Sequence, residues 1–274
     1  MASVTALPVQ PAAGARGAGR PVTLMSGDAL VLEGVSRTFG ALKAIDDVSL
    51  TVAAGERRAV LGANGAGKTT LFNAITGDFP PSAGRVRFFG EDVTWLPPFE
   101  RIRRGLRRTY QSSLLFRDLS VSDNLFLAVR GVNTGRFSFV RPGAGHPSQV
   151  AVHDLLERIR LTHVAGQPVS ALSHGQQRQL EIGMALAGAP RLILFDEPAA
   201  GLSPGERREL VALLGAFPAH LGFVIIEHDL DIALRVAERV TIMHEGRILK
   251  HGTPAEIQDD AEVQAIYMGG KAGA

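Results

Sequence analysis

A glycine-rich segment, GANGAGKT at residues 62–69, constrains the fold of this chain more than any other feature. It follows a short apolar run, RRAVL at 57–61, and leads into KTTLFNAITG at 68–77, a helical pattern. The pattern G-x-x-x-x-G-K-[ST] turns its backbone tightly at the glycines and brings N–H groups against phosphate oxygens. The positive N-terminal end of the following helix favours the same anion. The segment therefore predicts a strand, a phosphate-binding loop and a helix, in that order.

The chemistry of phosphate binding predicts a role for each part of this loop. Lys68 is expected to reach the β- and γ-phosphates, and the Thr69 hydroxyl to bind Mg²⁺. The expected nucleotide-binding residues of this segment are Gly62, Asn64, Gly65, Ala66, Gly67, Lys68, Thr69 and Thr70.

Two acids end a second apolar run, LILFDEP at 192–198. Asp196, at the end of a buried strand, is expected to hold Mg²⁺ through water. Glu197 is expected to point elsewhere, because side chains alternate along a strand, and to polarise an attacking water. The alternative, that Asp196 only ends the strand, is disfavoured by the phosphate-binding loop upstream.

Hydrophobic patterns divide the chain into an α/β part and a helical part. The runs RRAVLG, RLILFD and FVIIEH are short, continuous and apolar, which is typical of strands covered on both faces of a parallel sheet. ALVLEGVS and IDDVSLTV alternate like half-buried strands, and RVTIMHEGRILKHG predicts two strands joined by a tight turn at Glu245-Gly246. Helical patterns dominate from about 112 to 188, which predicts a helical insertion.

Composition excludes several classes of function. The 274 residues carry a net charge of +2, which gives no sign of a nucleic-acid partner, and they include no cysteine for thiol chemistry or disulfides. No apolar run reaches the length of about 18 residues that crosses a bilayer. Residues 1–27, rich in Ala, Gly and Pro, are expected to be a disordered tail, and Met25 is an alternative start.

The segment LSHGQQRQLEI, 172–182, predicts a second helix start suited to an anion. Ser173 can cap the helix, and Gly175 leaves room for close approach. The first phosphate cradle already surrounds most of one triphosphate, which raises the question of where this second helix start finds its phosphate. An ordinary N-cap at Ser173 is the alternative.

The motifs together resemble those of the ABC ATPases. LSHGQ is similar to the family's LSGGQ signature, and it stands in the expected order with the phosphate loop, LILFDEP and IIEHD. The resemblance covers about residues 29–269. It implies that Gln111 senses Mg²⁺ and a membrane partner, that His228 orients the γ-phosphate, and that Phe39 stacks on adenine. Gln111 as a solvated loop residue, and Phe39 as an ordinary aromatic, are the alternatives.

The resemblance also implies the architecture: one cassette at 28–269 with a RecA-like P-loop core (28–111 and 189–269), an antiparallel β subdomain, a helical subdomain at 112–188 and a short tail at 270–274. In this family two cassettes face head to tail, so Ser173, Gly175 and Gln176 are expected to meet ATP held by a partner subunit. ATP and Mg²⁺ are the implied cofactors, and catalysis is expected to use Lys68, Gln111, Glu197 and His228.

At finer scale the chain resembles the ATPases of branched-chain amino acid importers, through LSHGQQRQLEI, DEPAAGLSP, VIIEHDLDIAL and GTPAEI…VQAIYMGG. This implies two membrane permeases, a periplasmic or extracellular substrate-binding protein, and a place on the cytoplasmic face of the membrane. Urea or amide import, lipopolysaccharide export, and a soluble ABC ATPase acting on ribosomes or DNA remain alternatives.

Several residues depart from the family pattern or stand outside it. His174 replaces the usual glycine, Ser203 replaces the D-loop aspartate, and Tyr110 replaces a phenylalanine. The run ERIRRGLRRT, 100–109, holds five arginines, and we expect a solvated basic face, with a membrane or partner contact as the alternative.

Overall fold

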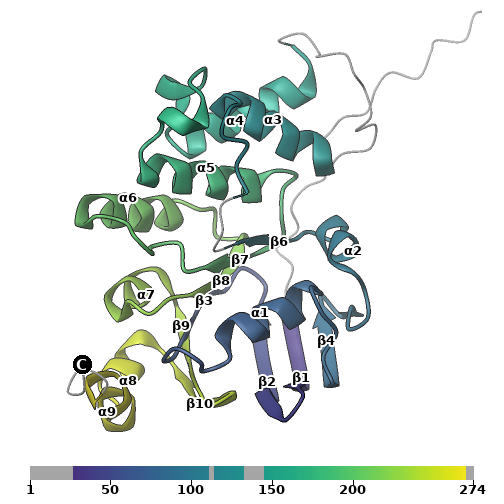
Figure 1. Ribbon diagram of the computed structural model, residues 1–274, viewed down its shortest axis with the longest axis vertical. Helices are drawn as coiled ribbons and strands as arrows, with labels where there is room; N and C mark the ends of the chain where they lie inside the picture. The colour runs from purple at the N-terminus through teal and green to yellow at the C-terminus, as the bar shows by residue number, and fades with distance from the viewer. Residues whose placement is uncertain (1–26, 111–113, 133–144, 270–274) are drawn as a thin grey trace, which may run out of the picture.

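The computed structural model describes residues 27–110, 114–132 and 145–269. The molecule contains two β-sheets that lie next to each other, and helices cover them (Figure 1). The helices α3, α4 and α5 form one end of the molecule. Among the described residues, no helix has the length and apolar character needed to span a membrane. The C-terminal helices α8 and α9 lie at the opposite end (Figure 1).

The larger sheet is parallel except for one edge strand. Its order is β10-β9-β3-β8-β7-β6. Every pair from β9 to β6 is parallel, and β10 pairs antiparallel with β9. The strands are β3 (Arg57–Leu61), β6 (Leu106–Thr109), β7 (Leu192–Asp196), β8 (Gly222–Ile226), β9 (Arg239–His244) and β10 (Arg247–Gly252).

These strands confirm the expectation drawn from the short apolar runs. Every residue of β7 and β8 is buried, because both faces of the sheet are covered. The turn between β9 and β10 is also as expected. Glu245 and Gly246 both have positive φ, 45° and 78°, as a tight two-residue hairpin turn requires.

The smaller sheet is antiparallel, with the order β2-β1-β4-β5. It comprises β1 (Asp28–Phe39), β2 (Leu42–Ala53), β4 (Ala83–Phe88) and β5 (Glu91–Asp92). Most of β2 alternates between buried and exposed residues, since one face of the sheet packs on the core. This sheet confirms the expected antiparallel part of the α/β fold.

Nine α-helices occur in the described ranges. Three of them, α3 (Val121–Val132), α4 (Pro147–Arg158) and α5 (His174–Leu186), follow one another without an intervening strand, as the helical patterns predicted. The others are α1 (Lys68–Thr76), α2 (Pro98–Arg103), α6 (Pro204–Gly215), α7 (Leu230–Val236), α8 (Pro254–Gln258) and α9 (Ala261–Gly269).

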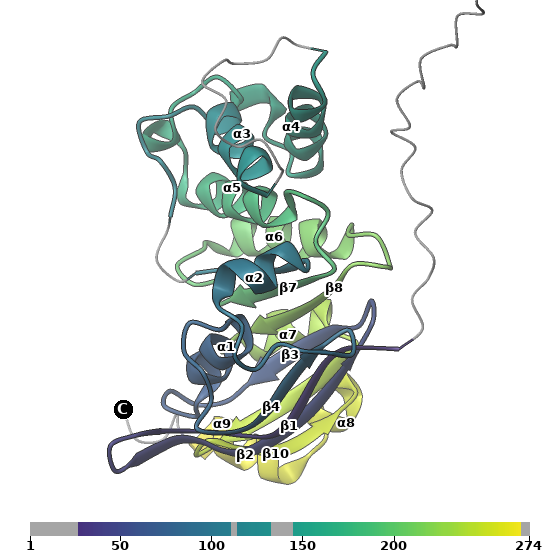
Figure 2. The same cartoon turned by 90° about the vertical axis from the view of Figure 1, so that its right-hand side faces the viewer.

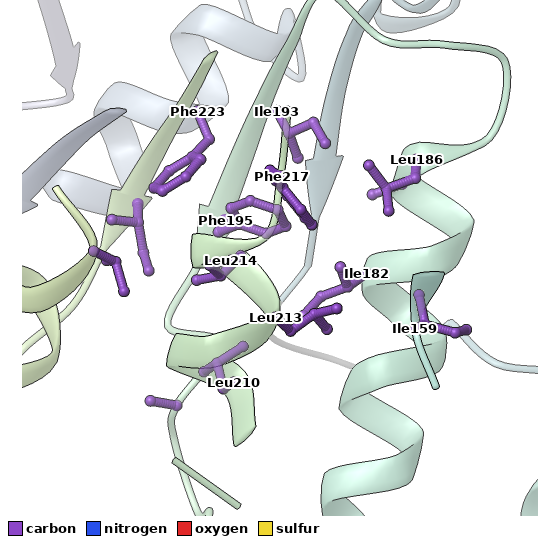
Figure 3. Packing of buried hydrophobic residues seen from close by; sticks show 14 of the residues in the cluster. Ile159, Ile182, Leu186, Ile193, Phe195, Leu210, Leu213, Leu214, Phe217 and Phe223 are labelled. Carbon is purple, nitrogen blue, oxygen red and sulfur yellow. The ribbon is translucent and has the colours of Figure 1, made fainter. Parts of the chain in front are cut away.

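The parallel sheet separates two hydrophobic cores, because successive side chains point to opposite faces. On one face, Phe195 of β7 and Phe223 of β8 pack with α5 and α6 (Figure 3). On the other face, Leu194 and Val224 pack with α1 and the antiparallel sheet. Helices α1 and α5 therefore lie on opposite sides of the parallel strands, as both views show (Figures 1 and 2).

Candidate functional site

The expected site residues gather at the carboxyl ends of adjacent parallel strands. The phosphate loop follows β3, Asp196 ends β7, and His228 comes two residues after β8. Because β3 pairs with β8, and β8 with β7, these ends meet at one edge of the sheet. Gln111 follows β6 in the sequence but lies outside the described residues.

The glycines of the phosphate loop serve two different needs. Gly65 and Gly67 have φ of 81° and 94°, the left-handed region that favours glycine. Gly62 has no such φ. A Cβ there would lie 2.4 Å from the carbonyl oxygen of Met243 in β9, so Gly62 is required by close packing. A Cβ at Gly67 would likewise meet the Ala44 carbonyl at 2.5 Å, so the loop is seated between β2 and β9.

Lys68 occupies the centre of the phosphate loop. Its Nζ donates to the carbonyl oxygens of Gly62 and Ala63 at 2.7 and 3.0 Å. Burial lowers the pKa of Lys68, and the charges of Glu197 and Asp196 partly oppose that shift. A cationic amine held by two carbonyls beside two carboxylates can exchange those partners for phosphate oxygens.

The rest of the loop presents an open, donor-rich face. Asn64, Gly65 and Thr69 are exposed, Thr70 is half-buried and Ala66 is buried. The residue before α1 is Gly67, which supplies no side chain to cap the first N–H groups of the helix. These N–H groups can therefore bind an anion.

Asp196 fits a divalent cation. Its side chain is 1% exposed, and Oδ2 accepts a hydrogen bond from Arg108 at 2.7 Å. The other oxygen, Oδ1, is buried and accepts no hydrogen bond from the described residues. A buried carboxylate oxygen of this kind suits a cation or its bound water, so Asp196 and the Thr69 hydroxyl could hold Mg²⁺.

Glu197 and His228 lie together, as the sequence predicted for two residues of one site. The distance from Glu197 Oε1 to His228 Nδ1 is 3.4 Å, and the His228 side chain is 47% exposed. The reason given for the direction of Glu197 was wrong, however. The strand β7 ends at Asp196, and Glu197 takes φ of 49°, so a left-handed turn directs its side chain, not strand alternation.

Phe39 lies at the end of β1 and remains 44% exposed. Its ring meets Phe79 edge to face at 5.5 Å, and the Arg37 guanidinium lies 4.8 Å from its centroid. A half-exposed ring held in place in this way can stack on a flat ligand.

Ser173 caps α5 as expected, in a complete capping box. Its Oγ accepts from the Gln176 N–H at 3.2 Å, and the Gln176 side chain accepts from the Ser173 N–H at 3.0 Å. Gly175 is indeed closely approached, but by this chain. Its N–H donates to Glu206 Oε1 of α6 at 2.8 Å, and a Cβ would lie 2.6 Å from that oxygen.

The five arginines between 100 and 109 do not form a solvated basic face. Three of them, Arg101, Arg107 and Arg108, are buried or nearly so, while the Arg103 side chain is 58% exposed. Arg104 pairs with Glu91 and Glu100. The expectation fails because these side chains bond to carbonyls and carboxylates of distant segments, which the sequence does not reveal.

Sequence reasoning missed three residues that contact the site: Arg108 at Asp196, Glu206 at Gly175, and Glu227 beside His228. Glu227 is buried, and its Oε1 accepts from the Ala199 N–H at 2.9 Å. The only signal for Glu227 is a charged residue directly after a continuous apolar strand. A carboxylate in such a position is either at a site or paired.

Comparisons with known proteins agree with this geometry. A model of the ABC transporter family matches residues 45–200, and a model described as a branched-chain amino acid ATP-binding cassette transporter matches residues 249–273. The chain is 34% identical to the high-affinity branched-chain amino acid transport ATP-binding protein BraF of Pseudomonas aeruginosa. It is 36% identical to LivG of Salmonella typhimurium, and each comparison covers 89% of this chain and 99% of the relative.

The fold is likewise similar to a solved ATP-binding cassette. The crystal structure of the ADP conformation of MJ1267, an ATP-binding cassette of an ABC transporter, superposes with a TM-score of 0.77 at 31% identity. The comparison covers 89% of this chain and 99% of the other.

Proposed function

The chain belongs to the ABC transporter family, whose ATP-binding cassettes hydrolyse ATP to power transport, and from that premise we propose that it is the ATPase subunit of an importer for branched-chain amino acids. The observation that carries the site assignment is the meeting of the phosphate loop, Asp196 and the Glu197–His228 pair at one edge of the parallel sheet. The names of the relatives and the match at residues 249–273 support the cargo.

In the proposed mechanism, the phosphate loop and Lys68 bind the triphosphate and neutralise its charge. Mg²⁺, when bound with ATP, adds further charge neutralisation at the phosphate oxygens. Glu197 accepts a hydrogen bond from the attacking water and draws away its proton, and His228 orients the γ-phosphate and that water. Asp196, Thr69 and Gln111 would hold Mg²⁺, and Phe39 would stack on the adenine.

The proposed assembly is a pair of cassettes, identical or not, that close on two ATP molecules. Helices α5 and α1 pack on opposite faces of the parallel sheet, which supports the proposal that Ser173, Gly175 and Gln176 act on the nucleotide of the partner subunit. We further propose two permeases, a periplasmic or extracellular binding protein, and a location on the cytoplasmic face of the membrane. The division into a core at 28–111 and 189–269 and a helical subdomain at 112–188 remains part of this proposal.

An exposed apolar surface supports a protein partner near residue 111. Trp95 is 76% exposed, and Phe99, Ile102 and Tyr110 are also exposed. Large apolar side chains in contiguous exposed groups are typical of interaction surfaces. Urea import, lipopolysaccharide export and soluble ABC ATPases are the competing functions, and no observation on the described residues favours them.

Two substitutions test the chemistry. Glu197→Gln should retain ATP binding and abolish nearly all hydrolysis, because the amide cannot take a proton; a general base contributes about 10²–10⁴-fold in rate. Lys68→Ala should instead weaken ATP binding itself. Phosphate release and fluorescent-ATP binding measure both effects, and full turnover by Glu197→Gln would remove Glu197 from the mechanism.

The cargo needs a separate experiment. The chain would be expressed with the permeases encoded by neighbouring genes, and vesicle uptake of labelled leucine and of urea would be compared. ATP-dependent leucine uptake that Glu197→Gln abolishes is expected. Uptake of urea alone, or no association with permeases, would overturn the cargo or the transporter assignment respectively.

A further inference from the structure

Arg108 connects the strand that carries Asp196 to the helix that begins at the phosphate loop. It lies in β6, its side chain is 5% exposed, and its Nη2 donates to Asp196 Oδ2 at 2.7 Å. Its Nη1 donates to Asp78 Oδ2 at 2.9 Å and to Asn73 Oδ1. Asn73 and Asp78 lie at the C-terminal end of α1, the helix whose first residue is Lys68.

The surroundings of Arg108 leave its guanidinium in one orientation. Aromatic rings flank it, with the Phe72 and Tyr110 centroids 5.7 and 4.8 Å away. A planar guanidinium that donates from two nitrogens to partners on different elements cannot rotate without losing one of them. The Asp196 carboxylate, bonded through Oδ2, is therefore held at a fixed angle.

The second oxygen of Asp196 is the one left for a ligand. Oδ1 is buried and accepts no hydrogen bond from the part of the chain that the structure describes. Asp196 ends β7, and the phosphate loop follows β3; because both strands pair in parallel with β8, the carboxylate lies at the same edge of the sheet as the phosphate loop. With Oδ2 held by Arg108, Oδ1 is the oxygen of Asp196 that remains available to a ligand.

We propose that Arg108 is a positioning residue for Mg²⁺: it fixes the Asp196 carboxylate through Oδ2, so that Oδ1 is already directed at the metal that accompanies ATP. This inference rests on the proposed function. Arg108 touches neither metal nor nucleotide in this account. Hydrogen-bond partners of metal ligands commonly change metal affinity by about 10–100-fold when they are removed.

The test measures Mg²⁺ dependence and not hydrolysis. A fluorescent non-hydrolysable ATP analogue is titrated into the full chain in EDTA and across a series of Mg²⁺ concentrations. The variants are Arg108→Met, which removes the guanidinium, and Arg108→Lys, which keeps the charge but has all its donors on one nitrogen and so cannot span partners on two elements. Arg103→Met is the matched control, since Arg103 belongs to the same run and is mostly exposed, and Asp196→Asn is the reference for a lost metal ligand.

We expect Arg108→Met to need about tenfold or more additional Mg²⁺ for half-maximal binding, and Arg108→Lys several-fold, on the scale set by other such partners. Affinity in EDTA should stay within about twofold of wild type, and Arg103→Met should match wild type. Equal losses with and without Mg²⁺ would mean a merely structural role and overturn the inference.

If Arg108→Met does not fold, Arg108→Lys alone still tests the inference. An unchanged Mg²⁺ requirement in Arg108→Lys overturns the inference. If Asp196→Asn also leaves the Mg²⁺ requirement unchanged, the proposed metal site fails as well. If Asp196→Asn raises the Mg²⁺ requirement while Arg108→Lys leaves it at the wild-type value, only the role of Arg108 fails.

Discussion

Glu227 shows how one buried side chain can link two segments of the site. Its carboxylate accepts hydrogen bonds from the Ala199 N–H, which follows Glu197 in sequence, and from the His228 N–H. Burial raises its pKa to about 7, with a further contribution from the nearby charges of Glu197 and Asp229. Glu227 therefore holds the loop after β7 against the loop after β8.

The raised pKa predicts a pH dependence of stability. The folded protein binds the Glu227 proton more tightly than the unfolded chain does. Its stabilising contribution is therefore complete below about pH 4.5 and is lost as the pH rises to about 7. Glu227→Gln should remove up to about 3 kcal/mol of pH-dependent stability, summed between about pH 4.5 and 7, while keeping an acceptor for the Ala199 N–H.

Urea unfolding at pH 5, 6, 7 and 8 measures this prediction as the difference between variant and wild type. The other titrating groups cancel in that difference, because they are present in both proteins. Parallel stability curves for the two proteins would show that Glu227 does not titrate in this range.

Helix α1 depends on a side chain from another element for its C-terminal end. Arg101 of α2 is buried, and its Nη1 donates to the carbonyl oxygens of Ala74 and Ile75 at 2.8 and 2.6 Å. Its other nitrogens donate to the carbonyls of Thr94 and Leu96, both at 2.9 Å. Burial lowers the Arg101 pKa to about 10, yet it remains a cation at neutral pH, which suits the negative end of a helix.

Arg101→Met should destabilise the protein by about 3 kcal/mol or more, because several buried carbonyls would lose their donor at once. The side chain of Arg103 offers a matched control, and Arg103→Met should change stability by less than about 0.5 kcal/mol. Denaturant unfolding at pH 7 compares the two. Equal effects would mean that the carbonyl contacts of Arg101 contribute little.

At the scale of the whole molecule, the helix α1 that begins at the phosphate loop and the helix α5 that Ser173 caps pack on different sides of the parallel sheet (Figures 1 and 2). Ser173 is exposed at the start of α5. The arrangement is consistent with a site that a second copy, or a similar chain, completes.

This predicts that Ser173→Arg separates ATP binding from dimer formation. In a Glu197→Gln background, Ser173→Arg should abolish ATP-dependent dimers in sedimentation, because a large cation blocks the partner's γ-phosphate contact. The affinity of the monomer for ATP should stay within about twofold, since the sequence places Ser173 outside the phosphate loop at 62–69 and its hydrogen bonds are to Gln176 and Gln177.

His153→Arg, an added charge on the exposed face of α4, is the control and should dimerise normally. Weakened ATP binding by the Ser173→Arg monomer would contradict a site completed in trans.

Local patterns did not predict β4, β5 or β6, but they were sufficient for the strands β1 to β3 and β7 to β10, the phosphate loop and the capped start of α5. In each case the physical cause is short-range: alternation, glycine dihedrals and capping act over a few residues. Local patterns also predicted Lys68, Asp196 and Glu197, whereas His228 was predicted only from the resemblance in motif order to a known family.

Long-range packing decided the rest. Four contacts join residues that are 27 to 181 positions apart in the sequence. They are the hydrogen bonds of buried Arg101 to Ala74 and of Arg108 to Asp196, the contact of Glu206 with Gly175, and the close packing at Gly62. The direction of Glu197 depends on a left-handed turn that the next strand holds through the Ile226 carbonyl. The sequence around a charged residue does not show whether its side chain is solvated or is buried against polar partners. Its burial depends on which distant carbonyls and carboxylates the fold brings to it.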